Sequence, residues 1–309
     1  MNQERNKQIR FASWVGIISN IFLASLKIII GFLAGSFAVI GDGIDSATDV
    51  LTFFITLIAA RIMNKPPNCK YPYGYNRAEA VATKALSFVI FFAGAQLFFS
   101  SLIHIIQNEP REVPSEWAIY VILISFVGKA ILAWYQFAVG KKQESKMLIA
   151  NGKNMRNDIL ISASVLAGLL FTSILKLPVL DLITAMLVSL WIMKTAFGIF
   201  METNKELMDG VEDTAIYYKI FDAVESVNGA HNPHRLRLRK HANLYVIALD
   251  IEVDANMSIK DGHQIAKNVE IRIRECLDNV YDVMVHTEPL GNIEREQYGL
   301  SREIIDNEK

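Results

Sequence analysis

Three acidic residues interrupt an otherwise apolar stretch early in the chain. Asp42, Asp45 and Asp49 lie in GDGIDSATD, where Asp45 and Asp49 are four residues apart. On a helix this spacing places both carboxylates on one face, about one turn apart. Two carboxylates this close repel each other, so the spacing is tolerated when a cation lies between them or when one is protonated. The pair is therefore a candidate cation site.

A second pair of oxygen-bearing residues has the same spacing. Asn154 and Asp158 lie four residues apart in NGKNMRND. If the two helices face each other, three carboxylates and one amide converge, with no histidine or cysteine among them. Such hard oxygen ligands favour Mn²⁺, Mg²⁺ or Ca²⁺ over Zn²⁺ or Cu²⁺. The sequence therefore predicts a divalent metal site at Asp45, Asp49, Asn154 and Asp158.

Two alternative roles for these acidic residues stay open. The Asp residues could form structural ion pairs, for which the apolar stretches offer Lys27, Lys84 and Lys129. For Asp42 an ion pair is as plausible as a metal role. An intramembrane aspartyl protease also needs two Asp on separate helices, but it uses one carboxylate per helix and gives no role to Asn154. We therefore expect a protein that is not an enzyme.

Apolar stretches surround these side chains and must position them. Six precede residue 205, at roughly 12–34, 36–60, 80–106, 116–138, 157–175 and 178–201. Most approach or exceed the roughly 20 residues that cross a bilayer as a helix. The start of the fifth helix could lie earlier, near Met147. Ionised side chains inside a membrane usually mark a substrate path.

Basic residues in the loops predict how the helices are oriented. The N-terminus and the segments 61–77 and 141–156 are rich in Lys and Arg, whereas the alternate loops contain only Arg111 and Lys176. By the positive-inside rule both termini are cytoplasmic, and the even number of helices agrees. We expect a multi-pass protein of the inner cell membrane.

Composition divides the chain into two parts. Hydrophobic residues make up 52% and charged residues 20%, whereas a soluble protein usually has about 25% charged residues. Residues 206–309 contain 12 Lys and Arg against 20 Asp and Glu, a balance of −8, and the balance of residues 1–205 is +7. The basic residues lie between apolar blocks, which excludes a nucleic-acid-binding face. The only cysteines, Cys69 and Cys276, suggest no disulfide framework.

After Lys205 the pattern is typical of a small α+β domain. Helices are expected at 212–227 and 258–276, and strands at 234–240, 244–253 and 280–286. The order αββαβ suits helices on one face of a short sheet. The expected domains are a membrane domain over 1–205, a cytoplasmic domain over 206–290, and an acidic flexible tail over 291–309.

Motifs, helix number and domain order together resemble the cation diffusion facilitator family over roughly residues 10–290. The resemblance implies a homodimer that exports divalent metal ions from the cytoplasm in exchange for protons, without a prosthetic group. It also implies a ferredoxin-like cytoplasmic domain. Carried over to this chain, the transport site of the family would be Asp45, Asp49, Asn154 and Asp158.

The residue at position 154 bears on the transported ion. Asn154 stands where zinc-transporting members have a histidine, and the DxxxD and NxxxD pairs resemble those of manganese-transporting members. An amide oxygen in place of imidazole nitrogen removes a ligand that Zn²⁺ prefers, although it does not exclude Zn²⁺. We therefore expect Mn²⁺/H⁺ antiport across the bilayer, with Zn²⁺ or Fe²⁺ export as the alternative. A membrane metal sensor without transport is an alternative of another class.

The loop after the second stretch departs from a zinc-binding pattern of some members, DxxHxxGH. This chain has NCKYPYGY there, with Asn68, Tyr71 and Tyr75 at ligand positions. Since tyrosine is a poor Zn²⁺ ligand, we expect no metal in this loop and an anchoring role for the tyrosines at the membrane interface.

The resemblance also implies regulatory metal binding in the cytoplasmic domain. Positions where members hold such ions are occupied here by His231, Asp250, His263, His286 and Glu288. Asp250 replaces a common histidine and Glu288 a common aspartate, which again favours a harder ion. His234 is a further candidate. The alternative is that all of these are ordinary polar residues of the surface.

Overall fold

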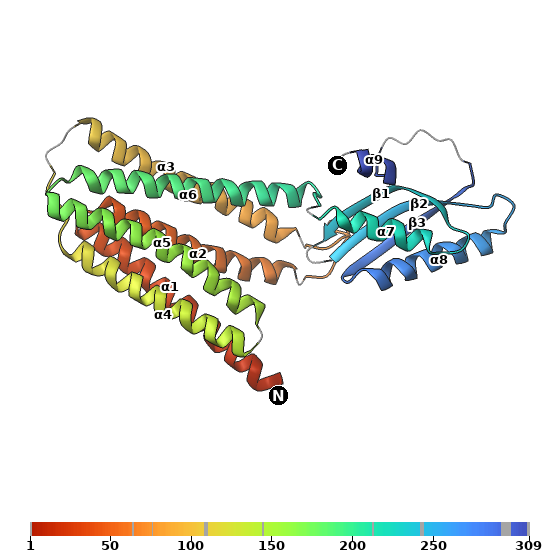
Figure 1. Cartoon of the computed structure of the whole chain (residues 1–309), viewed down its shortest axis with the longest axis horizontal. Helices are drawn as coiled ribbons and strands as arrows, with labels where there is room; N and C mark the ends of the chain where they lie inside the picture. The colour runs from red at the N-terminus through yellow and green to blue at the C-terminus, as the bar shows by residue number, and fades with distance from the viewer. Residues whose placement is uncertain are drawn as a thin grey trace. The chain divides into compact units, whose positions relative to one another are not determined.

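The computed structural model describes residues 2–63, 65–75, 77–107, 111–143, 145–211, 213–241, 244–291 and 298–307. The chain divides into two compact units, each shown in Figure 1. The first consists of Met1–Arg61 and Ala82–Met201, and the second of Ile62–Val81 and Glu202–Lys309. The loop before the third helix belongs to the second unit, where the guanidinium of Arg77 pairs with Asp209.

Long helices account for most of the chain before residue 208. Their bounds are α1 Asn2–Leu33, α2 Phe37–Met63, α3 Ala78–Gln107, α4 Trp117–Lys142, α5 Lys146–Leu175 and α6 Val179–Leu207. Each of the six contains a segment long and apolar enough to cross a membrane. The prediction of a six-helix membrane domain is confirmed, and the chain is a multi-pass membrane protein.

The fifth helix begins well before its apolar stretch. Ser145 caps α5, because its hydroxyl accepts a hydrogen bond from the N–H of Leu148 at 3.4 Å. The polar segment around Asn154 therefore continues the helix that carries Asp158. The four-residue spacing of these two residues is helical, as the predicted metal site requires.

Small residues let the membrane helices approach closely. A Cβ atom at Gly41 of α2 would lie 2.9 Å from Leu97 and 3.1 Å from Val188, so α2, α3 and α6 touch there. Near the start of α2, the carboxylate of Asp181 accepts hydrogen bonds from the Ser36 hydroxyl at 2.5 Å and from the Phe37 N–H at 2.8 Å. This carboxylate from α6 satisfies donors at the N-terminus of α2 and joins the two helices.

The second unit contains an αββαβ domain, as predicted. Its elements are α7 Ala215–Glu225, β1 His231–His241, β2 Leu244–Val253, α8 Ile259–Cys276 and β3 Val280–Pro289 (Figure 1). The sheet order is β1-β2-β3, with β1 antiparallel and β3 parallel to β2. Alternate residues of β2 pack against both helices in one core, which includes Ile220, Phe221, Ile247, Leu249, Ile251 and Ile273. The opposite face of the sheet is left for polar side chains.

Residues 298–307 pack against the cytoplasmic domain, whereas the sequence predicted a flexible tail over residues 291–309. Leu300 exchanges two backbone hydrogen bonds with Leu236, each 3.0 Å long. Helix α9, Arg302–Asn307, buries Ile305 in the core of the domain. The segment is acidic overall, but Leu300 and Ile305 are apolar, and their packing on the core holds the segment against the domain. Residues 292–297 of the predicted tail lie outside the described residues.

Candidate metal centres

Carboxylates from α2 and α5 form an acidic cluster in the membrane unit. Among the charged groups around Asp45 and Asp49, Asp158 exerts the largest electrostatic effect on both. Asp45 and Asp158 are half-buried, whereas Asp49 and Asn154 are exposed. Asn154 precedes Asp158 by about one turn of α5. The charge of Asp158 thus acts on both carboxylates of α2, and the predicted amide lies on the same helix as Asp158. Among the described residues, however, Asp45, Asp49 and Asp158 do not form a group whose ligand atoms all lie within 4.8 Å of one another.

A lysine on the neighbouring helix α4 adds a positive charge to this cluster. The Nζ of Lys129 lies 3.0 Å from Oδ2 of Asp158, and the lysine side chain has no exposed surface. The charges of Asp42 and Asp49 also act on Lys129. A metal ion bound to Asp158 must share that carboxylate with the ammonium or displace it.

Asp42 belongs to a separate ion pair. Its Oδ2 lies 2.7 Å from the Nζ of Lys27, and both side chains are fully buried. The hydroxyl of Ser162 lies 3.0 Å from each carboxylate oxygen and donates to the carboxylate, while Lys27 also donates to Ser46 at 3.1 Å. Removal of one partner from such a buried pair would leave an uncompensated charge, which is costly. The contacts of Asp42 thus agree with the ion-pair role that the sequence left open.

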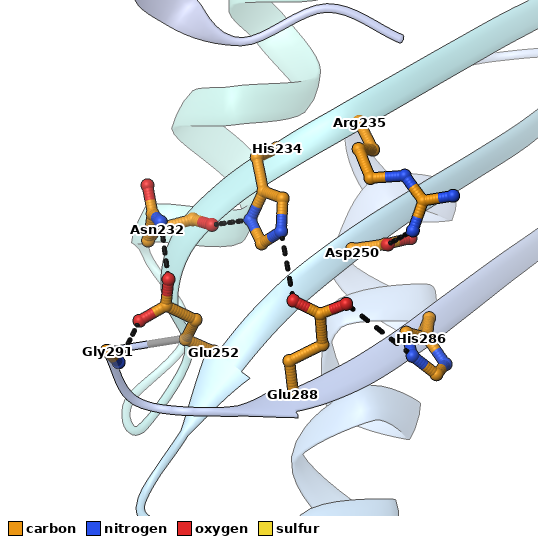
Figure 2. A network of polar contacts seen from close by, with 8 residues as sticks. All are labelled: Asn232, His234, Arg235, Asp250, Glu252, His286, Glu288 and Gly291. Atoms are coloured by element: carbon orange, nitrogen blue, oxygen red, sulfur yellow. Dashed lines mark hydrogen bonds and ion pairs between the residues drawn. The ribbon is translucent and has the colours of Figure 1, made fainter. Parts of the chain in front are cut away.

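A second cluster of metal-binding residues lies on the polar face of the sheet. His234, Asp250 and Glu288 are buried, and one ligand atom from each lies within 4.8 Å of the others (Figure 2). The Nε2 of His234 is 3.2 Å from Oε2 of Glu288, and its Nδ1 is 2.6 Å from the carbonyl oxygen of Asn232. When Nδ1 carries the proton, it donates a hydrogen bond to this carbonyl oxygen. The lone pair of Nε2 then faces the carboxylates and can coordinate a metal ion.

Two β-bulges explain why His234 belongs to this cluster. The pairing of β1 with β2 shifts between His231 and His234 and again between His234 and Arg237. At these bulges Asn232 and Arg235 have φ of 42° and 46°, in the left-handed region. Three residues of β1 therefore span two residues of β2, so that His234 pairs with Asp250. Strict alternation along the strand would place His231 and His234 on opposite faces.

The other predicted ligands lie around or away from this cluster. His286 is exposed, and its Nε2 is 3.7 Å from Oε1 of Glu288. His231 is exposed and pairs with Glu252 in the sheet, and His263 is exposed on α8. Among the described residues, the structure thus groups Asp250 and Glu288 with His234 rather than with His231 or His263.

The carboxylates of this face have further partners. Arg235 donates from Nη1 to Oδ2 of Asp250 at 2.6 Å, which partly neutralises that ligand. Glu252 accepts hydrogen bonds from the N–H of Gly291 at 2.7 Å and from the amide of Asn232 at 2.6 Å (Figure 2). Both hydrogen bonds lower the pKa of Glu252, and the bond from Gly291 has the larger effect. An ionised Glu252 therefore fixes the turn after β3 and the bulge before His234.

The loop between α2 and α3 uses its polar groups internally. The amide of Asn68 donates to the hydroxyl of Tyr75 at 2.8 Å, and the rings of Tyr71 and Tyr75 are 4.6 Å apart. These three residues occupy the positions where the sequence departs from a zinc-binding pattern.

Helices that can span a membrane, buried charges between them and a separate αββαβ domain are typical of a multi-pass membrane transporter. Residues 13–208 match the family described as cation efflux transmembrane domain, and residues 213–290 match the cation efflux protein cytoplasmic domain. The chain therefore belongs to the cation diffusion facilitator family. Divalent metal cations are its transported substrates, and efflux is its activity. The match to the cytoplasmic domain supports a homodimer.

Several known proteins are similar to this chain over most of their length. A transporter of Methanocaldococcus jannaschii is 34% identical over 280 residues, which cover 89% of this chain and 96% of that protein. The manganese efflux system protein MneS of Bacillus subtilis is 30% identical over 279 residues, with coverage of 89% and 94%. Among solved structures, the metal-bound C-terminal domain of the CzcD transporter from Thermotoga maritima is 40% identical and matches with a TM-score of 0.26. It covers 27% of this chain and 100% of that domain.

Proposed function

We propose that the protein exports Mn²⁺ in exchange for protons and binds the ion at Asp45, Asp49, Asn154 and Asp158. The observation that carries the proposal is the pairing of Asp45 with Asp49 one turn apart on α2 and of Asn154 with Asp158 one turn apart on α5, with the charge of Asp158 acting on both α2 carboxylates. All four side chains offer oxygen, which suits Mn²⁺ better than it suits Zn²⁺. The similarity to two proteins named for manganese efflux, MneS and MneP of Bacillus subtilis, supports the choice of ion.

Exchange with protons follows from the chemistry of the ligands. Carboxylates bind either a metal ion or a proton, so protonation weakens their hold on the metal. The amide of Asn154 does not gain or lose a proton at physiological pH, so the carboxylates have to carry the proton. By the positive-inside rule, the basic loops support an orientation with both termini in the cytoplasm, residues 1–205 in the inner membrane and residues 206–290 in the cytoplasm.

A transport assay tests this proposal. The purified protein is reconstituted in liposomes, and uptake of Mn²⁺, Zn²⁺, Fe²⁺, Co²⁺ and Cd²⁺ is measured with and without a pH gradient. We expect Mn²⁺ uptake that becomes faster when the liposome interior is more acidic than the outside, because protons then leave as the metal ion enters. Faster uptake of Zn²⁺ or Fe²⁺ than of Mn²⁺ contradicts the choice of ion. No uptake of any ion, together with metal binding by the soluble domain, points to a metal sensor.

We further propose that the cytoplasmic domain binds a regulatory divalent ion at His234, Asp250 and Glu288. The observation that favours this second function is the convergence of these buried ligand atoms within 4.8 Å. A bound ion would also offset part of the net charge of −8 over residues 206–309 when two copies approach. His286, beside Glu288, is available as a further ligand.

A further inference from the structure

Lys129 lies among the carboxylates of the membrane site although its charge has the same sign as the transported ion. The side chain is fully buried, and its Nζ is 3.0 Å from Oδ2 of Asp158. The charges of Asp158, Asp42 and Asp49 all act on it. A cation bound by these carboxylates and the ammonium of Lys129 therefore compete for the same negative charge.

A comparison with Lys27 shows that the two buried lysines are held differently. Lys27 pairs with Asp42 and donates to two hydroxyls, those of Ser46 and Ser162, so each of its three N–H groups has a partner. The Nζ of Lys129 lies 3.0 Å from Asp158, but the described residues give it no hydroxyl partner. All three donors of Lys27 are thus satisfied, whereas Lys129 is held by its ion pair with Asp158.

The number of charges in the cluster fits a divalent ion. Lys27 and Asp42 neutralise each other, which leaves the carboxylates of Asp45, Asp49 and Asp158 with the ammonium of Lys129. Their sum is −2 when all are ionised, and one divalent ion makes it zero. Without Lys129 the site would keep a negative charge after binding a divalent ion, which is costly within a membrane.

We propose that Lys129 is a tethered counter-cation of the transport site. Its ammonium holds Asp158 before the metal binds, is displaced from that carboxylate when the metal arrives, and returns when the metal leaves. Lys129 thereby gives the site a net charge of −2, which one divalent ion neutralises. Its return to Asp158 also assists release of the metal ion. This inference rests on the proposed transport site, and Lys129 acts in it as a positioning residue for charge rather than as a metal ligand.

Binding and transport by the full-length protein test the inference together. Mn²⁺ affinity is measured by calorimetric titration in lipid nanodiscs, and the heat that Asp49→Ala removes is assigned to the membrane site. Mn²⁺ uptake is measured in liposomes. We expect Lys129→Met to lower the Kd of that site about tenfold or more, because it removes a competing charge a few ångströms away. We also expect it to slow uptake, because release loses its assistance.

Two control variants separate this effect from a structural one. Lys129→Arg keeps the positive charge, so it should not tighten the binding of Mn²⁺ as Lys129→Met does. The double variant Lys27→Met and Asp42→Asn removes the other buried ammonium together with its partner carboxylate, so it should lower thermal stability without tightening the binding of Mn²⁺. If Lys129→Met is not recovered in folded form, Lys129→Gln carries the same expectation with a polar side chain.

The outcomes distinguish failure of this inference from failure of the transport site. If the neutral variant binds Mn²⁺ no more tightly than the wild type while Asp49→Ala loses binding, Lys129 is only a structural partner of Asp158. The inference is then wrong and the transport site stands. If Asp49→Ala keeps the wild-type affinity and uptake, the transport site itself is wrong.

Discussion

The side chain at position 154 distinguishes two kinds of transport site. Asn154 adds an amide oxygen to the carboxylates of Asp45, Asp49 and Asp158 in the proposed site. Zn²⁺ prefers imidazole nitrogen or thiolate, whereas Mn²⁺ accepts a shell of oxygen ligands alone. The preference between the two ions should therefore respond to one substitution.

Asn154→His should raise the rate of Zn²⁺ transport relative to Mn²⁺ by roughly tenfold, which corresponds to about 1.4 kcal/mol. The reason is that the imidazole supplies the nitrogen ligand that the site lacks. Initial rates of uptake of each ion into liposomes provide the measurement. Asn204→His on α6 introduces the same side chain at a position outside the predicted site and serves as the control. An unchanged ratio in Asn154→His would locate selectivity in helix packing instead.

At the residue scale, local spacing predicts side-chain positions better on a helix than in a bulged strand. Asp45 and Asp49 lie one turn apart on α2, as their spacing predicted, because the positions of residues four apart on a helix depend on little else. The sequence offered His234 only as a further candidate, and its place beside Asp250 could not be predicted, because two bulges shift its position in the sheet. The second bulge depends on a partner far along the chain, since Gly299 packs against the backbone of Arg235 and has no room for a Cβ atom. No local pattern contains that information.

At the scale of elements, the strands of the small domain determine which histidine lies beside Asp250 and Glu288. In residues 206–309 expressed alone, a divalent ion should raise the melting temperature by binding the folded state. The double variant His234→Ala and Glu288→Ala should lose most of that shift. The measurement is thermal unfolding with and without Mn²⁺ or Zn²⁺.

His263→Ala is the matched control for this experiment, because the predicted ligand His263 is exposed on α8 and outside the cluster. It should keep the full shift. If His263→Ala loses the metal-induced rise in melting temperature and the double variant keeps it, the ion is bound at His263 and not at the cluster of His234 and Glu288.

The turn after β3 should make the domain sensitive to acid. Because its hydrogen bonds lower the pKa of Glu252 below the ordinary value of 4.5, ionised Glu252 stabilises the folded domain. The contribution is complete above pH 4.5 and is lost as the pH falls through the lowered pKa. Glu252→Gln should therefore lower the melting temperature at neutral pH, and its difference from the wild type should shrink in acid.

Thermal unfolding of the two proteins between neutral pH and the acid range measures this effect. Glu275→Gln is the control, because Glu275 is an exposed acid whose ion pair with Arg272 lies on the surface of α8. A difference between Glu252→Gln and the wild type that is constant with pH would show that the charge of Glu252 has no part in stability.

The bounds of elements followed from the sequence where a single physical rule dominates. The helices α2, α3, α4 and α6 were close to their predicted ranges, because apolar length alone determines a membrane span. Helix α5 begins at Lys146, beside the earlier start near Met147 that the sequence offered, because the cap at Ser145 extends the helix through polar residues. Helix α9 could not be predicted, since its stability comes from burial of Ile305 in the core of the domain.

At the scale of the molecule, the division into a basic apolar part and an acidic polar part was visible in composition. The structure adds that the loop over residues 62–81 belongs to the second unit, which the sequence did not indicate. Its Arg77 also donates to the carbonyl oxygen of Leu207 at 3.3 Å. Such a contact joins segments far apart in the chain and leaves no local pattern.

The most direct test of the account concerns Asp49, one of the three carboxylates in the membrane cluster. Asp49→Ala should abolish Mn²⁺ uptake into liposomes driven by a pH gradient, while the protein keeps its fold and its amount in the membrane. Glu202→Ala, which removes an exposed acid from α6 outside the cluster, should transport at the wild-type rate. Uptake at the wild-type rate by a folded Asp49→Ala protein would contradict the proposed site.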